Sequence, residues 1–195
     1  MIKTLTSLSR VRNTNILLRR PLKIKLKGKF IKSQLYQDVF ADYLIGTIYD
    51  KTFLEFGATD GLELSNTHLL ENYSKWKGVL AEPDPQWHKQ LKKNRPNTKI
   101  ITDCIWKKSG ETVDFLSSED GVLSTINSFR YNDKQSMPTN AEDRNKKFQT
   151  IKVNTVSLND LIKNELNNVS PSYISVDTEG SEYEILKNFN FLKYN

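Results

Sequence analysis

The chain has 195 residues, of which 37% are hydrophobic and 27% are charged, an ordinary composition for a single globular domain. One cysteine and two histidines are too few for a disulfide framework or a Cys/His zinc cage. The sequence contains no run of 18 apolar residues, which excludes a membrane-spanning helix of ordinary length.

The positive charge is confined to the start of the chain. Residues 1–32 hold ten of the 29 Lys and Arg residues and none of the 23 Asp and Glu residues. The remaining 19 bases and 23 acids leave a net charge of −4 from Ser33 onward. We therefore expect a basic N-terminal arm over 1–32 and one domain over 33–195.

Such an acid-free arm is compatible with several roles. It resembles a solvated segment without a partner, an organelle transit peptide, or an arm that touches anionic membrane or nucleic acid. No interleaved aromatic motif of RNA-binding proteins accompanies it, so no specific nucleic-acid partner is expected. The single Cys104, in the apolar context TDCIW, predicts a buried thiol in a reducing compartment, and hence a cytoplasmic protein.

The first predicted elements alternate between helix and strand. Residues 33–46 predict an amphipathic helix with Ser33 as N-cap, because apolar side chains recur at helical spacing at Leu35, Val39, Phe40, Tyr43 and Leu44. Strands are then predicted at 52–56, 78–85 and 98–106, with helices at 66–73 and 85–93 between them. This alternation predicts parallel βαβ units in an α/β sheet covered on both faces.

Residues 107–150 break the alternation. ETVDFLS (111–117) reads as a strand, and 118–148 as a long surface excursion of the kind that forms a lid, an acceptor loop or a disordered segment. A strand from Gln149 and a helix capped by Ser157 follow, and then a last strand at 173–176 with a helix from about Ser181. The four core strands are expected in the order 3-2-1-4, with the last as a hydrophobic edge.

The turn after the first strand is the first candidate site. Glu55, Gly57 and Gly61 form an E-x-G-x-x-x-G pattern instead of the G-x-G-x-x-G pattern that cradles a pyrophosphate. An acid at this place repels phosphate but suits the ammonium and sulfonium charges of S-adenosylmethionine. Glu82, 25 residues after Gly57 at the next strand end, is placed to accept hydrogen bonds from a ribose diol. Its neighbour Asp84 has no assigned role in ligand binding.

A second candidate site is the acidic turn in ISVDTEGSEYEIL. Asp177, Glu179 and Glu182 surround one strand end, where mutual repulsion raises a pKa or recruits a divalent cation. The alternative is that these acids only cap the following helix and favour its dipole.

These stretches together resemble one family. SQLYQD, FLEFGATDGLELSNTHLLE, WKGVLAEPDP and SYISVDTEGSEYEIL follow one another as in the FkbM-type methyltransferases, over about residues 33–192. The resemblance implies a Rossmann-like three-layer fold with a mostly parallel sheet, S-adenosylmethionine as cofactor, and methyl transfer to a hydroxyl oxygen of a sugar, polyketide or similar small molecule. By the same resemblance the cofactor-binding residues are Glu55, Gly57, Ala58, Asp60 and Gly61 on the methionine side, Asn66, Glu82 at the ribose, and Asp103 near the adenine.

The acidic turn then becomes the catalytic candidate. Asp177 is expected to act as the base for the acceptor hydroxyl or as a metal ligand, with Glu179 as its partner and Glu182 third. If a divalent cation such as Mg²⁺ takes part, Asp177 and Glu179 would hold it. Asn66 and Thr67 would orient cofactor or acceptor, or simply cap the next helix.

One feature departs from the family pattern. The family carries further strands after this acidic turn, whereas the chain ends 15 residues past Gly180, so the fold is expected to be truncated after its fourth core strand. A second copy or a missing C-terminal segment would then cover the edge. The alternative function is a catalytically inactive S-adenosylmethionine-binding or protein-interaction module. An NAD-dependent oxidoreductase is disfavoured by the glycine spacing and by the lack of a Tyr-x-x-x-Lys pair.

Overall fold

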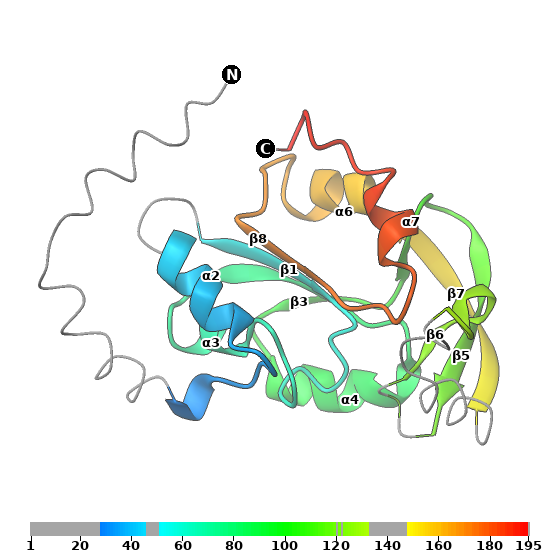
Figure 1. Ribbon diagram of the computed structural model, residues 1–195, viewed down its shortest axis with the longest axis horizontal. Coiled ribbons are helices and arrows are strands. Elements are labelled where there is room, and N and C mark those ends of the chain that lie inside the picture. The colour runs from blue at the N-terminus through cyan, green and yellow to red at the C-terminus, as the bar shows by residue number, and fades with distance from the viewer. Residues whose placement is uncertain (1–27, 46–50, 120, 122, 133–147, 195) are drawn as a thin grey trace, which may run out of the picture.

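A computed structural model describes residues 28–45, 51–119, 121, 123–132 and 148–194. Its central feature is a four-stranded sheet in which all neighbouring strands are parallel (Figure 1). Across the sheet the strands are β3 (Lys99–Ile101), β2 (Lys77–Ala81), β1 (Thr52–Phe56) and β8 (Tyr173–Val176). This confirms the predicted order 3-2-1-4. Among the described residues, β8 lies at one edge of the sheet.

A second sheet lies beside the first and mixes parallel and antiparallel pairs. Its order is β4 (Cys104–Trp106), β7 (Phe148–Ser157), β5 (Thr112–Ser118) and β6 (Thr125–Ile126). Figure 1 shows the long strands β5 and β7 at the end of the molecule opposite α2. The strand predicted at 111–117 is therefore confirmed as β5, and part of the predicted surface excursion, residues 125–129, forms β6 and the 3-10 helix η3 (Asn127–Phe129).

The single strand predicted over 98–106 is wrong. The chain leaves the first sheet after Ile101 and joins the second at Cys104, which pairs with Thr155 of β7. Ile101 still accepts a hydrogen bond from the N–H of Glu82, so the first sheet ends there. An almost continuous apolar run does not show where such a change of sheet occurs, because both halves are buried.

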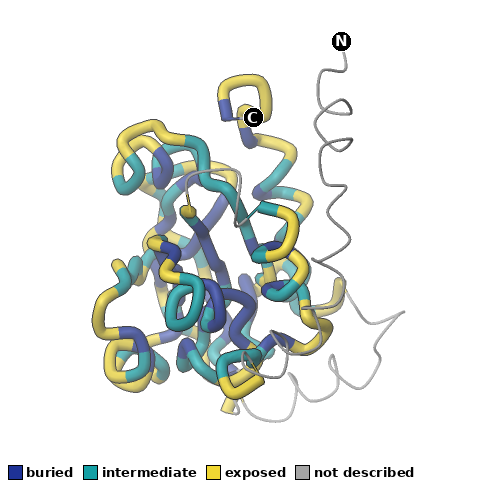
Figure 2. The backbone as a smooth tube through the Cα atoms, turned by 90° about the vertical axis from the view of Figure 1, so that its left-hand side faces the viewer, coloured by how far each residue is buried: buried dark blue, intermediate teal, exposed yellow. Residues whose placement is uncertain are grey.

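Helices cover both faces of the first sheet, which confirms a three-layer α/β arrangement (Figure 1). Alternate residues of the strands supply the two cores, so that Phe53 and Leu80 face one layer while Leu54 and Val79 face the other. On the side of Phe53 lie α2 (Gln37–Ile45), α3 (His68–Asn72) and α4 (Pro85–Asn94); on the other lie α6 (Leu158–Glu165) and α7 (Glu182–Leu186). In Figure 2 the buried backbone runs through the middle of the molecule.

The first helix differs from its prediction. It begins at Gln37, and the Ser33 hydroxyl donates to Asp38 at 2.5 Å instead of capping at position 33. Its buried residues are Asp38 and Ala41, whereas most of the predicted apolar face is exposed. Helical spacing identified the helix correctly but assigned the wrong face to the core.

The ends of two other helices follow the sequence closely. The Ser157 hydroxyl accepts a hydrogen bond from the N–H of Asp160 at 3.1 Å, which confirms the predicted cap of α6. The carboxylate of Asp84 caps α4 in the same way, through the N–H of Gln86 at 3.2 Å. This gives Asp84 a structural role.

The proposed boundary between arm and domain at residue 32 stays a prediction. Residues 1–27 lie outside the described ranges, as does 133–147 of the predicted excursion. The 3-10 helix η2 (Gly28–Phe30) ends in Phe30, whose carbonyl oxygen lies 2.9 Å from Nδ1 of His68. The packed part of the chain thus includes Phe30.

Candidate active site

A cavity of about 260 Å³ opens at the carboxyl ends of the central strands. It lies where the chain order reverses between β1 and β8, the usual place for ligands in parallel α/β sheets. Part of its wall comes from the second sheet, so both sheets are needed to form it. The lining residues used below are Glu55, Gly57, Ala58, Asp60, Asn66, Glu82, Trp87, Cys104, Ile105, Asp177 and Glu179.

The glycine turn has a backbone conformation that favours glycine at both Gly57 and Gly61. Gly57 and Gly61 have φ angles of +75° and +72°, in the left-handed region that favours glycine. A Cβ atom on Gly57 would collide with the backbone oxygen of Asp177, and one on Gly61 with the side chains of Leu91 and Arg95. Gly57 therefore allows the turn to pack closely against the Asp177 backbone, and Gly61 allows it to pack closely against Leu91 and Arg95.

The N–H groups of this turn are directed into the protein. Those of Gly57 and Ala58 donate to the carbonyl oxygen of Ala81, that of Thr59 donates to Glu82, and that of Gly61 donates to Ala58. A loop that cradles phosphate leaves such groups available to the ligand. This geometry agrees with the expectation that the ligand is not a dinucleotide.

Glu55 lines the cavity, but protein donors surround its carboxylate. Oε1 accepts from the N–H of Asn66 at 2.6 Å, and Oε2 accepts from the hydroxyls of Ser65 at 3.1 Å and Thr67. Burial raises the pKa of the Glu55 carboxyl, while the nearby Arg95 guanidinium opposes that change. The main function of this acid is thus to hold the loop after the glycine turn.

Arg95, which sequence reasoning missed, completes this network from the end of α4. Its Nη1 donates to Gly61 and to the Ser65 hydroxyl, both at 3.1 Å, and its Nε pairs with Glu71. The side chain is fully buried. Nothing in the sequence KKNRPN distinguishes this arginine from the neighbouring surface lysines, because its partners are distant in the chain.

Asn66 presents an unsatisfied acceptor. Its Nδ2 donates to the Ser175 hydroxyl at 2.9 Å, and its Oδ1 is buried without a hydrogen-bond partner. Buried polar atoms are nearly always satisfied in folded proteins, so this oxygen is expected to accept from a donor that the described protein groups do not supply. Asn66 was expected near the cofactor, and the residue lines the cavity.

Glu82 extends into the cavity from the end of β2. Its Oε2 accepts from Thr59 at 2.8 Å and its Oε1 accepts from the N–H of Asp84 at 2.9 Å. Burial raises the pKa of the Glu82 carboxyl to about 7, and the nearby Asp84 adds to this. Each oxygen retains a lone pair for a further donor.

The remaining cofactor candidates occupy different positions. Asp60 lines the cavity and accepts from the N–H groups of Leu62 and Glu63, both at 2.8 Å. Asp103 is not a lining residue; its neighbours Cys104 and Ile105 form the wall instead. The Cys104 thiol is buried as expected, and burial raises its pKa to about 12.

Trp87 is a lining residue that the sequence did not single out. It lies in the first turn of α4 and packs against Gly121, where an added Cβ would collide with the indole ring. Its aromatic side chain offers a flat apolar wall near the Glu82 strand end. The position of a tryptophan two residues into a helix carries no signal for this role.

After β8, at the same edge of the sheet as Glu82, two of the three predicted catalytic acids line the cavity: Asp177 and Glu179. Burial raises the pKa of the Asp177 carboxyl, and the charge of Glu182 raises it further. Glu179 lies in the same turn with a φ of +55°. An acid whose pKa is raised and which lies next to a second acid is suited to accept a proton.

Glu182 has a different role. Its Oε1 accepts from the N–H groups of Thr178 at 2.9 Å and Gly180 at 3.1 Å, and its Oε2 accepts from Gly180 at 3.0 Å. It is not a lining residue, so it positions the turn that carries Asp177. Glu182 therefore supports the turn before α7, and the catalytic roles expected for Asp177 and Glu179 stay a prediction.

The donor set does not fit a divalent cation. Among the described residues no group of three or more His, Cys, Asp or Glu side chains is arranged to hold a metal ion. Asp177 and Glu179 remain as two acids, and the protein's own N–H groups occupy the Glu182 carboxylate.

The parallel sheet, the cavity at its switch point and the buried acid after the second strand define a Rossmann-like α/β ligand-binding domain. A model of the methyltransferase FkbM domain matches residues 55–194, and the chain belongs to that family. No curated protein and no solved structure matches the chain significantly. Over the described ranges no helix is long and apolar enough to cross a membrane.

Proposed function

We propose that the protein transfers a methyl group from S-adenosylmethionine to a hydroxyl oxygen of a sugar, a polyketide or a similar small molecule. Family membership supports methyl transfer. The observation that carries the proposal is that one cavity contains both the buried acid Glu82, suited to a nucleoside, and the acid Asp177, which is exposed at the cavity and has a raised pKa, suited to a proton acceptor.

The residues present fit this cofactor. The unsatisfied Asn66 Oδ1 is an acceptor for the ammonium group, and the free lone pairs of Glu82 are acceptors for the ribose hydroxyls. Gly57, Ala58 and Asp60 would surround the methionine portion, while Gly61 packs against α4 and does not line the cavity. When bound, the cofactor supplies an electrophilic methyl group on a sulfonium leaving group. Trp87 and Ile105 offer apolar walls for the adenine, and Asp103, which is two residues before Ile105, does not line the cavity.

Asp177 is the proposed general base. As the acceptor oxygen forms its bond to the methyl carbon, the hydroxyl proton passes to the Asp177 carboxylate. Its raised pKa makes it a better proton acceptor than an aspartate with an ordinary pKa. Glu179 assists as the second acid, and Glu182 holds the turn. Most of the rate enhancement is expected from alignment, because the acceptor oxygen must lie in line with the breaking carbon–sulfur bond.

Two measurements test the proposal. Calorimetry measures S-adenosylmethionine binding, and methyl transfer to a panel of hydroxylated acceptors measures turnover. Asp177→Asn should retain cofactor affinity within a few-fold and lose turnover by about a hundredfold or more. Asp114→Asn is the matched control, since Asp114 is an exposed aspartate paired with Lys152 outside the cavity.

The outcomes separate the candidate functions. Cofactor binding without turnover on any acceptor would favour the inactive S-adenosylmethionine-binding module. Absence of cofactor binding by the folded wild-type protein would reject both. A fully active Asp177→Asn variant would reject the role of the base but leave the proposed reaction intact.

A further inference from the structure

Acidic side chains are concentrated in the wall of the cavity. Six carboxylates line it, and among the described lining residues none is Lys, Arg or His: Glu55, Asp60, Glu63, Glu82, Asp177 and Glu179. The same wall includes Asn66, whose buried Oδ1 needs a hydrogen-bond donor that the described protein groups do not supply. The polar groups of the cavity therefore favour a ligand that brings positive charge and hydrogen-bond donors.

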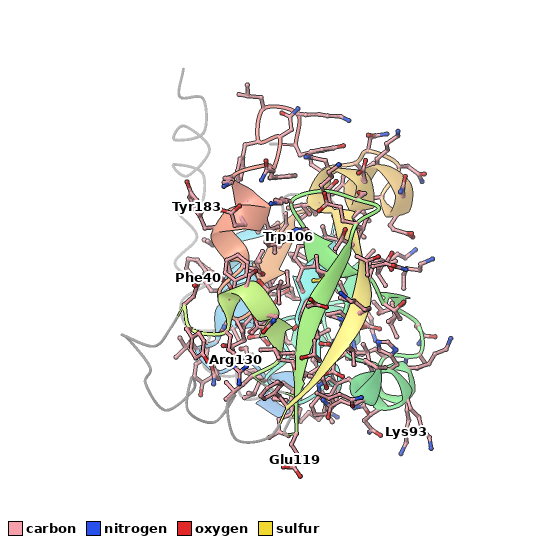
Figure 3. All side chains as sticks on the ribbon, turned by 90° about the vertical axis from the view of Figure 1, so that its right-hand side faces the viewer. Phe40, Lys93, Trp106, Glu119, Arg130 and Tyr183 are labelled. Carbon is pink, nitrogen blue, oxygen red and sulfur yellow. The ribbon has the colours of Figure 1, made fainter. Side chains whose placement is uncertain are left out.

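The basic side chains at α4 do not neutralise this wall. Arg95, at the end of the helix, is fully buried and pairs with Glu55, so only that acid has its charge compensated. Nε2 of His88 lies 2.8 Å from the backbone oxygen of Glu82, and His88 does not line the cavity. Lys93 is exposed, and Figure 3 shows it at the margin of the molecule.

Three of the cavity acids have no described cation beside them. No ion pair between described residues includes Asp60, Glu63 or Asp177, although Glu63 and Asp177 are exposed and a lysine could reach them. Elsewhere on the surface such pairs do form, as between Lys152 and Asp114 at 2.6 Å. The negative charge of the cavity is therefore left for the ligand to compensate.

The cofactor compensates only part of this charge, since it brings an ammonium and a sulfonium group against one carboxylate. We infer that the methyl acceptor is a hydroxyl compound that also carries an ammonium group, such as an amino sugar, and that phosphorylated or carboxylated acceptors are rejected. The carboxylate of Glu63 is available to this ammonium group, while Asp177 takes the proton of the hydroxyl. The inference rests on the proposed function and narrows its acceptor.

Other acceptor classes fit less well. Sites for phosphorylated ligands supply Arg or Lys side chains or unpaired backbone N–H groups. Here the N–H groups of Gly57, Ala58 and Thr59 all donate within the protein. A phosphate or carboxylate would therefore meet like charges, which oppose binding. A neutral sugar would leave Glu63 without a cation.

A comparison of acceptors that share one skeleton tests the inference on the full chain. Calorimetry first measures S-adenosylmethionine binding. The kcat/KM for methyl transfer is then measured near neutral pH for D-glucosamine, D-glucose and D-glucose 6-phosphate, and for the corresponding galactose series. We expect the amino sugar to exceed the neutral sugar by about tenfold or more, and the phosphate to fall at least about tenfold below it. Both ratios should shrink as the ionic strength rises.

Glu63→Gln tests the same charge without changing a proposed catalytic residue. Glu63 is exposed, so the variant should keep the wild-type circular dichroism and bind S-adenosylmethionine within about twofold of wild type. Its preference for glucosamine over glucose should fall by about threefold or more. Glu111→Gln is the matched control, because Glu111 pairs with Lys108 and does not line the cavity. The control should keep the wild-type preference.

The outcomes separate this inference from the proposed function. Absence of cofactor binding by the folded wild-type protein would reject both. Cofactor binding with no turnover of any of these sugars, with an equal or reversed preference among them, or with the same loss in Glu111→Gln would overturn the inference alone. A methyl group found on the amino nitrogen would support the cationic acceptor and contradict the proposed hydroxyl oxygen.

Discussion

Arg95 and Glu55 form a fully buried ion pair, with 3.9 Å between Nη1 of Arg95 and Oε2 of Glu55. The same guanidinium pairs with Glu71 of α3, so one cation compensates two acids from two different elements. The pair joins the end of α4 to the strand that precedes the glycine turn. The Glu55 carboxylate, the acid of the E-x-G-x-x-x-G pattern, therefore mainly positions the loop after the glycine turn.

Replacing Arg95 with Met should destabilise the protein strongly. The variant leaves Glu55 and Glu71 without their shared cation, and breaking a buried pair in this way costs about 3 to 5 kcal/mol. Urea unfolding monitored by circular dichroism gives the free energy of unfolding. Lys93→Met is the control, because Lys93 is an exposed cation on the same helix, and it should change stability by less than about 0.5 kcal/mol. Similar stability in the two variants would contradict a stabilising role for the ion pairs of Arg95 with Glu55 and Glu71.

Replacing Gly57 with Ala should disrupt the glycine turn. The added methyl group meets the Asp177 backbone oxygen, and the φ of +75° is itself unfavourable for alanine. We expect a loss of about 3 kcal/mol or more in stability together with loss of cofactor binding. Gly110→Ala separates the two causes, since Gly110 has a φ of +78° with no atom within 4 Å of the added Cβ. That control should cost about 1 kcal/mol; an equal cost at both positions would mean that the collision is relieved.

The Glu82 carboxyl should make stability depend on pH. Its pKa is about 7 in the fold against 4.5 as the reference value, so the folded protein holds this proton more tightly than the unfolded chain does. The free energy of unfolding therefore falls as the pH rises from 4.5 to about 7, by about 3 kcal/mol from this group. Urea unfolding of wild type and Glu82→Gln across this range measures it, and parallel curves for the two proteins would refute the assignment.

The same carboxyl should affect cofactor affinity in the opposite sense. Ribose hydroxyls donate more strongly to the ionised carboxylate, so binding of S-adenosylmethionine should strengthen as the pH rises through about 7. Calorimetry at several pH values measures this change. In Glu82→Gln the affinity should be lower and its increase with pH should be smaller; an unchanged pH profile would remove Glu82 from the ribose site.

Asn66→Ala should weaken cofactor binding and cost about 1 kcal/mol or more in stability, because it also removes the hydrogen bond from Nδ2 to Ser175. The variant removes the Oδ1 acceptor, which has no partner in the protein, and we expect an affinity about tenfold or more lower, as for loss of one hydrogen bond to a charged donor. Asn72→Ala is the control on α3, because the Asn72 side chain donates to the His68 carbonyl and does not line the cavity. Calorimetry distinguishes the two, and equal affinities would show that the ammonium group binds elsewhere.

Local chemistry explains why parts of the fold could be predicted. The caps at Ser157 and Asp84 depend on residues two or three positions away, and the glycine turn depends on the φ angles of Gly57 and Gly61. The strand order could also be predicted, because it is common to the Rossmann-like fold that the family resemblance implied. Each of these features needs only information that is close in sequence or common to the fold class.

Long-range contacts explain the errors. Leu35, Phe40 and Leu44 had the spacing of a core face, yet α2 turns Ala41 toward the core beside α3, with Val39 and Ile45 partly buried there. The run 98–106 is divided because Cys104 pairs with Thr155, 51 residues away, instead of continuing beside β2. Periodicity shows that a segment has an apolar side, but the neighbouring elements decide which side is covered.

From the sequence alone followed the class of the fold, the place of the glycine turn, and the acids Glu55, Glu82 and Asp177 as the candidates to examine, because strand ends of a parallel sheet converge on one edge. Only the tertiary structure decided how those acids divide their roles. The role of a carboxylate depends on the donors and charges around it, and these belong to residues distant in the sequence. Arg95 lies beside Glu55, and the N–H of Thr59 donates to Glu82.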